Sequence, residues 1–292
     1  ADRATMQNRG IKRERIIKTI KFGDHVINCG ERTFIMGILN VTPDSFSDGG
    51  DFNSVENAVS HAKEMIAEGA DIIDIGGESS RPGHQRITQE EELKRVIPVI
   101  RRLSEETEAI LSLDTIRAEV AEEGIKAGIH ILNDIWALQQ DREMAFVAAK
   151  YRTPVILMHN KSESVYENDI VEEIIGFFNK SIDIALNAGI AENMLILDPG
   201  IGFGKTPHQN VEIMGRLDEI KKLGFPLLLA ASRKSTLGLI LDLPPKERVE
   251  GTLATTVLGI AQGVDIVRVH DVKENLRAAK VADVLIRGNT FG

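Results

Sequence analysis

The stretch that decides the fold is AILSLDTIRAEVAEEGIKAGIHILND, residues 109–134. Two short apolar runs, 109–114 and 130–134, enclose a longer stretch with the periodicity of a helix. A short apolar run without alternation is typical of a strand that is buried on both faces. Two such strands lie parallel only if a crossover, usually a helix, connects them. The stretch therefore predicts one strand–helix–strand unit of a parallel sheet.

The same unit repeats along most of the chain. Outward from this stretch, eight apolar runs are found: 33–39, 71–75, 109–114, 130–134, 154–159, 194–198, 226–230 and 265–270. Eight strand–helix units match a closed (β/α)8 TIM barrel, which needs about 250 residues. The alternative is an open doubly wound sheet, whose dinucleotide-binding form carries G-x-G-x-x-G after the first strand. Here the first strand runs into Asn40-Val41-Thr42-Pro43-Asp44 instead, so we predict an α/β fold of the TIM-barrel type.

Two of the intervening stretches show clear helix signals. Residues 88–103 start with the pattern Thr-x-x-Glu, formed by Thr88 and Glu91. This pattern predicts a capping box, in which each side chain binds the backbone N–H of the other residue. Pro98 lies inside this apolar pattern and is expected to kink the helix. Residues 170–189 repeat the helical periodicity.

The N-terminal part precedes the barrel pattern. Residues 1–15 are polar and basic without apolar periodicity, and we expect a disordered tail or an addition to the natural chain. Residues 16–30 carry apolar side chains on both sides of the pair Gly23-Asp24, which predicts a short β-hairpin. The rest contains no linker rich in Pro, Gly or Ser, so residues 16–292 are expected to form a single barrel domain.

Composition narrows the class of protein. The chain has 292 residues, 42% hydrophobic, and a formal net charge of −9, which excludes a wholly disordered chain and argues against charge-driven binding of nucleic acid. No apolar run reaches the ~18 residues of a membrane span, and no signal peptide opens the sequence. Cys29 is the single cysteine, which excludes an intramolecular disulfide and a multi-cysteine zinc site. We expect a cytoplasmic enzyme or binding protein without a membrane partner.

Polar residues stand at the ends of all eight predicted strands: Asn40, Asp74, Asp114, Asn133 with Asp134, His159, Asp198, 232–235, and Arg268 with His270. A single polar residue at a strand end is usually a turn former or a helix cap. Polar residues at all eight strand ends predict a binding site, because in a barrel these ends meet at one mouth, where active sites lie. His159 alone is expected to be a buried histidine with satisfied hydrogen bonds.

These mouth residues fall into two chemical groups. Asp114, Asn133 and Asp198 suit a ligand that offers several N–H donors, such as a 2-amino-4-oxo heterocycle with its guanidine-like edge. The second group consists of potential cations: Arg81, Lys234, Arg268 and His270. Cations of this kind suit phosphate or diphosphate. The predicted site is therefore bipartite, with a polar heterocycle in the barrel and an anion toward the rim.

Three loops at this mouth stand out. Residues 40–50 and 76–83 combine glycines, hydroxyls, a proline and a charge, as expected of lids that close on a ligand. Residues 198–206 fail the phosphate-binding pattern G-x-x-x-x-G-K-[ST] because position 199 is proline. We expect this third loop to set Phe203 against a ligand.

Five motifs follow one another in the chain: NVTPDSFSD (40–48), DIGGESSRPG (74–83), DPGIGFGK (198–205), SRK (232–234) and RVH (268–270). With these motifs the sequence resembles the dihydropteroate synthase family, which sulfonamide drugs inhibit. The match spans about residues 33–285, nearly the whole chain. It implies a (β/α)8 barrel that joins 7,8-dihydropterin-6-ylmethyl diphosphate to p-aminobenzoate, giving dihydropteroate and diphosphate in folate synthesis. Ser80, where the family often has threonine, keeps the hydroxyl.

The resemblance also implies roles for individual residues. The residues implied to hold the pterin are Asp114, Asn133, Asp198 and Lys234. Those implied at the diphosphate are Asn40, Ser80, Arg268 and His270, with Mg²⁺ bridging near Asn40. Those implied to shape the p-aminobenzoate pocket are Phe46, Pro82, Phe203, Lys234 and Ser235. Asp48 and Arg81 would act from the closing loops, and Asp48, Arg81, Asp114, Asp198, Lys234 and Arg268 form the catalytic set.

The chemistry agrees with the bipartite site. Diphosphate can leave a methylene on an electron-rich pterin through a cation, an SN1-like path that needs no covalent nucleophile. Two rivals share the barrel: a pterin-binding methyltransferase, which has no diphosphate to expel and so no need for Arg268 and His270, and a non-catalytic pterin-binding paralogue, which would lack Asp48 or Arg81. A barrel aldolase with a Schiff-base lysine is not excluded by the position of Lys234. The family resemblance also makes a homodimer the expected assembly, with the last helices as its face.

Overall fold

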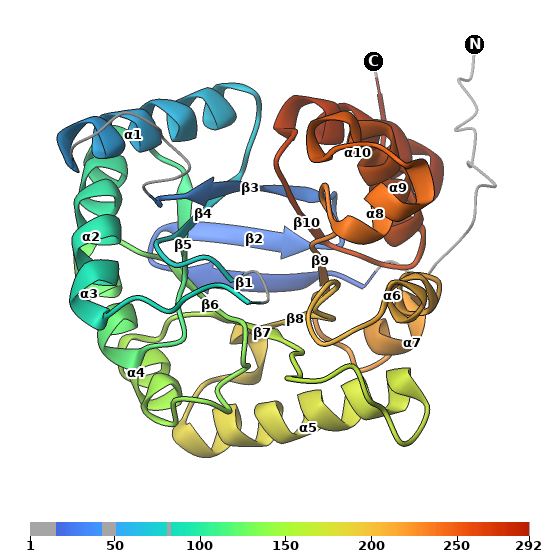
Figure 1. Cartoon of the computed structure of the whole chain (residues 1–292), viewed down its shortest axis with the longest axis horizontal. Coiled ribbons are helices and arrows are strands. Elements are labelled where there is room, and N and C mark those ends of the chain that lie inside the picture. The colour runs from blue at the N-terminus through green and yellow to red at the C-terminus, as the bar shows by residue number, and fades with distance from the viewer. Residues whose placement is uncertain (1–15, 43–50, 81–82, 292) are drawn as a thin grey trace, which may run out of the picture.

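The computed structural model describes residues 16–42, 51–80 and 83–291, and within them a ring of helices surrounds a sheet of eight parallel strands (Figure 1). The strands are β3 (Phe34–Asn40), β4 (Ile72–Gly76), β5 (Ile110–Asp114), β6 (Ile131–Asp134), β7 (Val155–Met158), β8 (Leu195–Asp198), β9 (Leu228–Leu229) and β10 (Ile266–Val269). Their order is β8-β7-β6-β5-β4-β3-β10-β9. A parallel bridge between Leu197 and Leu227 joins the two edges, which confirms the (β/α)8 barrel.

Strand β9 is shorter than predicted, because residues 226–230 contribute only Leu228–Leu229 to the ladder. The N–H of Leu227 donates to the carboxylate of Asp265 at 2.9 Å instead of to strand β8. At the same junction, the N–H of Leu197 donates to the carbonyl of Pro226 at 2.9 Å. The barrel therefore closes through an isolated parallel bridge at this seam.

Helices follow the strands around the barrel. They are α1 (Asp51–Ala67), α2 (Gln89–Glu106), α3 (Ala118–Ala127), α4 (Glu143–Tyr151), α5 (Ile170–Ala188), α6 (Pro207–Met214), α7 (Leu217–Lys221), α8 (Ser235–Leu241), α9 (Val249–Ala261) and α10 (Val272–Arg287), with 3-10 turns η1 (Glu192–Met194) and η2 (Pro245–Glu247). The part of the chain that the structure describes contains no helix long and apolar enough to cross a membrane.

The predicted start of α2 is half right. The Thr88 hydroxyl accepts from the N–H of Glu91 at 3.1 Å, as a capping box requires. The reciprocal bond is replaced, because the Glu91 carboxylate accepts from Arg95 Nε at 3.0 Å. The helix includes Pro98 and runs on to Glu106, beyond the predicted end at residue 103.

The predicted hairpin is present as β1 (Lys18–Phe22) and β2 (His25–Cys29), paired antiparallel with Ile20 opposite Ile27. It lies across the middle of the ring of helices in Figure 1. Ile20, Ile27 and Cys29 are buried in one apolar cluster with the first residues of several barrel strands. Those residues are Phe34, Ile72, Ile131, Leu228 and Ile266. The hairpin therefore closes the amino-terminal end of the barrel and leaves the opposite mouth for the site.

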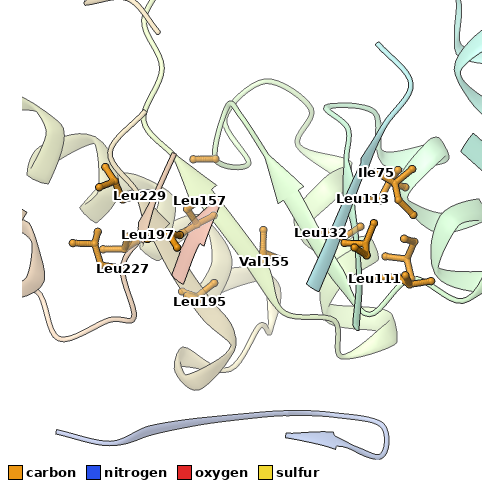
Figure 2. Close-up of a cluster of buried hydrophobic side chains, with 14 of the residues drawn as sticks. Ile75, Leu111, Leu113, Leu132, Val155, Leu157, Leu195, Leu197, Leu227 and Leu229 are labelled. Atoms are coloured by element: carbon orange, nitrogen blue, oxygen red, sulfur yellow. The ribbon is translucent and has the colours of Figure 1, made fainter. Parts of the chain in front are cut away.

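The main core lies between the strands and the helices. Figure 2 shows part of it, with Leu111 and Leu113 of β5 beside Leu132 of β6. Because side chains alternate along a strand, Ser112 and Asp114 of β5 point to the inside of the barrel. The same alternation turns polar residues of the neighbouring strands inward, and this arrangement builds the site.

Candidate active site

Arg268 of β10 and Asp74 of β4 form an ion pair at the mouth, across the intervening strand β3. Arg268 Nε donates to Asp74 Oδ2 at 2.8 Å, and the Asp74 side chain is fully buried. Asn133 Nδ2 donates to the same oxygen at 3.1 Å. Arg268 Nη2 also lies 4.0 Å from Asp114 Oδ2. The structure thus brings together Arg268, Asp114 and Asn133, which were predicted for the site, around Asp74.

Asp74 was noticed in the sequence only as a polar strand end. The alternation of side chains along β4 could have indicated that Asp74 points into the barrel. There it lies beside Ser112 of β5, its partner in the strand register. Among the described residues, three buried side-chain atoms have no hydrogen-bond partner: Asp74 Oδ1, Ser112 Oγ and Asn133 Oδ1. Buried polar atoms in proteins almost always have partners. Their convergence on one place supports a polar ligand or ordered water there.

Asp198 and Lys234 form the opposite side of the mouth. Asp198 is buried at the end of β8, and its Oδ1 accepts from the N–H of Gly200 at 2.9 Å. Lys234 precedes α8 and donates to the carbonyl of Ile201. Its ammonium also lies 5.0 Å from the centre of the Phe203 ring, within the range of a cation–π contact. Phe203 therefore lies beside Lys234, and its contact with a ligand stays a prediction.

Burial perturbs the titration of these groups. Burial, with the nearby Asp74 charge, raises the pKa of Asp114, and Arg268 opposes that rise. Burial also raises the pKa of Asp198, while Lys234 lowers it. Burial lowers the pKa of Lys234 to about 8, against the attraction of Asp198. Strong perturbations that share a concave site are typical of ligand-binding and catalytic centres.

The remaining predicted residues lie on the rim or outside the described part. Ser232 Oγ lies 2.8 Å from His270 Nδ1 and accepts from the His270 backbone N–H at 3.0 Å. Asn40 is exposed at the end of β3, and Ser235 is exposed at the start of α8. Four predicted residues lie outside the described residues: Phe46, Asp48, Arg81 and Pro82.

A cavity of about 610 Å³ opens beside Asp114. Its lining includes Ser79, Ser80, His84, Arg86, Thr115 and Trp136. Ser80 therefore lines the same cavity as Asp114, a carboxylate predicted to bind the pterin. The volume lies in the range of pockets that enclose small ligands.

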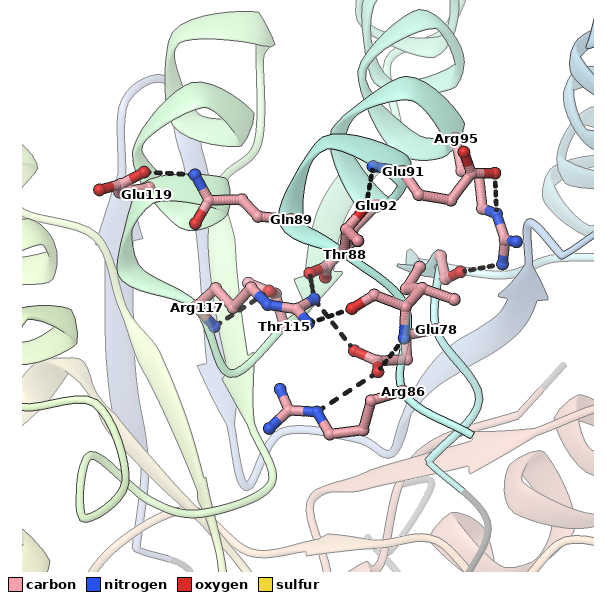
Figure 3. A network of polar contacts seen from close by, with 12 residues as sticks. Glu78, Arg86, Thr88, Gln89, Glu91, Glu92, Arg95, Thr115, Arg117 and Glu119 are labelled. Atoms are coloured by element: carbon pink, nitrogen blue, oxygen red, sulfur yellow. Dashed lines mark hydrogen bonds and ion pairs between the residues drawn. The ribbon is translucent and has the colours of Figure 1, made fainter. Parts of the chain in front are cut away.

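An ion-pair network, drawn in Figure 3, fixes the base of the second loop and was missed in the sequence. Arg117 Nη1 contacts Glu78 Oε2 at 3.2 Å and Glu92 Oε1 at 2.6 Å. Glu78 Oε1 accepts from the N–H of Ile87 at 3.0 Å, and Arg117 donates to the Ile87 carbonyl. The two ends of the segment 78–87 are therefore held together. These partners lie far apart in sequence, so no local pattern announces them.

A closed α/β barrel with inward carboxylates, an amide and cations at its mouth is the architecture of an enzyme that acts on a small molecule. A family model described as "Pterin binding enzyme" matches residues 36–270. The chain belongs to this pterin-binding family, in its dihydropteroate synthase group.

Curated relatives carry the name of that group. The chain is 54% identical to the dihydropteroate synthase of Clostridium beijerinckii over 269 residues, covering 92% of this chain and all of the relative. It is also 54% identical to the dihydropteroate synthase of Bacillus subtilis, covering 88% of this chain and 90% of the relative.

Solved structures agree. The Clostridium difficile dihydropteroate synthase, determined in the presence of pteroic acid, is 55% identical with a TM-score of 0.88, covering 89% of this chain and 99% of that one. The Xanthomonas albilineans enzyme with 4-aminobenzoic acid is 40% identical with a TM-score of 0.88, covering 92% of this chain and 98% of that one. The barrel and its family were thus correctly predicted from the sequence motifs.

Proposed function

We propose that this chain condenses 7,8-dihydropterin-6-ylmethyl diphosphate with p-aminobenzoate to give 7,8-dihydropteroate and diphosphate, as a transferase of folate synthesis. The observation that carries this proposal is the cluster of Asp114, Asn133 and Asp198 beside Lys234 and Arg268 at one mouth. The buried oxygen of Asn133 without a partner among the described residues supports binding of a heterocycle that offers N–H donors.

The carboxylates also support the chemistry of the pterin end. If the diphosphate leaves first, positive charge develops on the pterin, and Asp114 and Asp198 stabilise it. A unit charge ~4 Å from its partner at an effective dielectric constant of ~20 gains about 4 kcal/mol before desolvation. Two such contacts supply a substantial part of a catalytic effect of about 8 kcal/mol or more. The reaction then follows an SN1-like path without a covalent nucleophile.

Cations act at the leaving group. Arg268 and His270 bind the diphosphate, and Ser80 and Asn40 donate to it from the rim, because guanidinium, imidazole N–H, hydroxyl and amide N–H groups suit phosphate oxygens. Developing charge on a leaving oxygen is stabilised most by donors that are already in position. The ion pair with Asp74 holds the Arg268 guanidinium in such a fixed orientation.

Mg²⁺ is the cofactor that we propose for the diphosphate. Among the described residues, no group of three or more His, Cys, Asp or Glu side chains could hold a metal ion. Mg²⁺ commonly takes only one or two protein oxygens and completes its shell with water and phosphate oxygens. The exposed Asn40 amide at the end of β3 fits that mode. When bound there, Mg²⁺ would supply charge neutralisation for the diphosphate.

The p-aminobenzoate pocket is proposed above the pterin, at Phe203, Lys234 and Ser235. Phe203 offers an aromatic face beside the Lys234 ammonium, which suits an aromatic carboxylate. Phe46 and Pro82 are also proposed to bind p-aminobenzoate, and Asp48 and Arg81 are proposed catalytic residues; all four lie outside the described residues. The weakly basic arylamine needs no strong general base.

A single incubation tests the reaction. Purified protein, Mg²⁺, the pterin diphosphate and p-aminobenzoate should release diphosphate and form dihydropteroate in equal amounts. Release of diphosphate without dihydropteroate would contradict the transferase. Methyl transfer in a separate incubation with a methyl donor would favour the rival methyltransferase. Binding of a pterin without any turnover would favour the non-catalytic paralogue.

We propose a homodimer that uses the last helices. Large apolar side chains remain exposed on and beside α8, α9 and α10: Leu239, Ile240, Leu241, Leu243, Val257, Leu258, Val281 and Leu285. Helix α9 packs against both α8 and α10, and exposed apolar side chains on helices that pack together are typical of an interaction surface. Sedimentation at micromolar concentration should give a dimer, and Leu285→Glu should shift it toward monomer; a monomeric parent chain would contradict the proposal.

The single domain over residues 16–292 and the cytoplasmic location stay predictions.

A further inference from the structure

Lys205 is a buried lysine to which the proposed reaction assigns no role. It lies at the end of the loop 199–205 that joins β8 to α6, and only 8% of its surface is exposed. It directly precedes Thr206, which caps α6 with its hydroxyl. Lysine is almost never buried to this extent without partners.

The Lys205 ammonium is fully occupied. Nζ donates to the carbonyl of Gly200 at 2.9 Å and to the carbonyl of Phe203 at 2.8 Å. Its third contact is His159 Nδ1 at 2.8 Å, at the end of β7. An ammonium has three N–H donors and no acceptor. Burial lowers the pKa of Lys205 to about 7. In the ammonium form all three donors are used within the protein, and none is left for a substrate.

His159 serves as an acceptor here. It is buried, and burial together with the Lys205 and Lys161 charges lowers its pKa to about 2. A neutral imidazole with an accepting Nδ1 matches the ammonium at 2.8 Å. The ring also packs edge-on against Phe177, with centroids 4.7 Å apart. The expectation of a satisfied core histidine agrees with this geometry, and its partner is the loop lysine.

The loop is wound tightly around this ammonium. Gly200 has a φ of +72° and Gly204 a φ of +61°, conformations that favour glycine. A Cβ on Gly200 would lie 1.9 Å from the His159 carbonyl oxygen, so this backbone approach requires glycine. The Phe203 N–H closes the turn by donating to the Gly200 carbonyl at 3.0 Å. The two carbonyls that Lys205 binds are therefore the ends of one turn.

That turn carries three contacts of the proposed site. The Gly200 N–H donates to Asp198 at 2.9 Å, and the Ile201 carbonyl accepts from Lys234. The Phe203 ring lies 5.0 Å from the Lys234 ammonium. A change in the turn would therefore move Phe203 relative to Lys234, while Asp198 stays anchored in strand β8.

We propose that Lys205 is a positioning residue: its ammonium, clamped between the Gly200 and Phe203 carbonyls and His159, fixes the turn that presents Phe203 to p-aminobenzoate. The clamp follows from the three contacts of Lys205 Nζ, and its effect on binding of p-aminobenzoate rests on the proposed function. Lys205 touches no substrate, since all its donors are used. It acts through the loop backbone.

The experiment compares two matched pairs of variants. Lys205→Met keeps the length of the side chain and removes the ammonium, whereas Thr33→Val removes a buried hydroxyl bond to Asp283 elsewhere in the fold. His159→Leu removes the acceptor, whereas His159→Asn can place an amide oxygen near the position of Nδ1. The second pair keeps the test decisive if Lys205→Met fails to fold.

The first readout is independent of the reaction. Amide hydrogen exchange at Gly202 and Phe203 should become at least about tenfold faster in Lys205→Met and His159→Leu. It should remain within about threefold of the parent rate in His159→Asn and Thr33→Val. Unchanged exchange in Lys205→Met and His159→Leu would overturn the clamp.

The second readout is kinetic. In Lys205→Met and His159→Leu the KM for p-aminobenzoate should rise at least about tenfold, with the KM for the pterin diphosphate changed less than about threefold. A lower melting temperature with both KM values unchanged would show a structural role only and overturn the proposal. An equal rise of both KM values would overturn the specific action on Phe203. If the parent chain forms no dihydropteroate, the proposed function fails, and the exchange rates still decide whether the clamp exists.

Discussion

Arg268 Nε donates to the fully buried Asp74 Oδ2 at 2.8 Å, from strand β10 to strand β4 across strand β3. This pair sets the charge balance of the mouth. Burial lowers the pKa of Arg268, but the charges of Asp74 and Asp114 outweigh burial and raise it. The guanidinium therefore stays charged and fixed in orientation before any ligand binds.

Arg268→Ala should abolish most of the binding of the pterin diphosphate while a pterin without diphosphate still binds. A hydrogen bond to a charged group contributes ~1.5–3 kcal/mol, about 10- to 150-fold in affinity. Titration calorimetry with both ligands measures the difference. Removing Arg268 also leaves the buried Asp74 carboxylate without its counter-charge, at a cost of about 3–5 kcal/mol, so Arg268→Ala with Asp74→Asn is the stability control. Equal loss for both ligands in this double variant would contradict the bipartite site.

Asp114→Asn should weaken binding of a pterin that lacks diphosphate. The substitution removes a charge-assisted contact of ~1.5–3 kcal/mol, so affinity should fall about 10- to 150-fold. Calorimetry at constant pH measures this change. Asp242→Asn, at an exposed carboxylate, is the control and should leave affinity unchanged. Unaltered affinity in Asp114→Asn would remove this residue from the site.

The mouth could be predicted from sequence because parallel strands impose a simple geometry. Residues such as Asp114 and Asp198 stand at strand ends, and a barrel gathers those ends at one rim. Strand β9 was predicted too long, because the Asp265 side chain binds the N–H of Leu227. No apolar pattern reveals that competition.

Long-range polar pairs account for the rest. The contact of Arg117 with Glu78 spans 39 residues, and that of Lys205 with His159 spans 46. Taken alone in the sequence, each of these residues is interpreted as an exposed charge or as a core histidine. The folded barrel brings these partners together, and the sequence does not show that they are neighbours. The sequence therefore predicted the polar residues at the strand ends but not the side-chain contacts that hold the loops.

Ile20→Ala tests whether the N-terminal hairpin closes the barrel. Ile20 is 1% exposed within the cluster at the strand starts, so its truncation should lower the free energy of unfolding by about 2–5 kcal/mol. Urea denaturation measures this loss. Val26→Ala, at an exposed position of the same hairpin, should change stability by less than about 1 kcal/mol. Substrate KM values should stay within about twofold in both variants, and an undiminished unfolding free energy in Ile20→Ala would contradict the packing role.

Ligand binding should weaken above pH 8 because Lys234 loses its charge there. Burial lowers the pKa of its ammonium from the usual 10.5 to about 8, so the positive form prevails below that pH and the neutral form above it. Affinity for the pterin diphosphate should therefore be constant from pH 6.5 to 7.5 and decline about tenfold per pH unit well above pH 8. Titration calorimetry across this range gives the profile. Lys234→Arg keeps its charge at every pH tested, so its profile should stay flat between pH 7.5 and 9.5, whatever its absolute affinity. An identical decline in Lys234→Arg would assign the pH dependence to another group and contradict the role of the Lys234 charge.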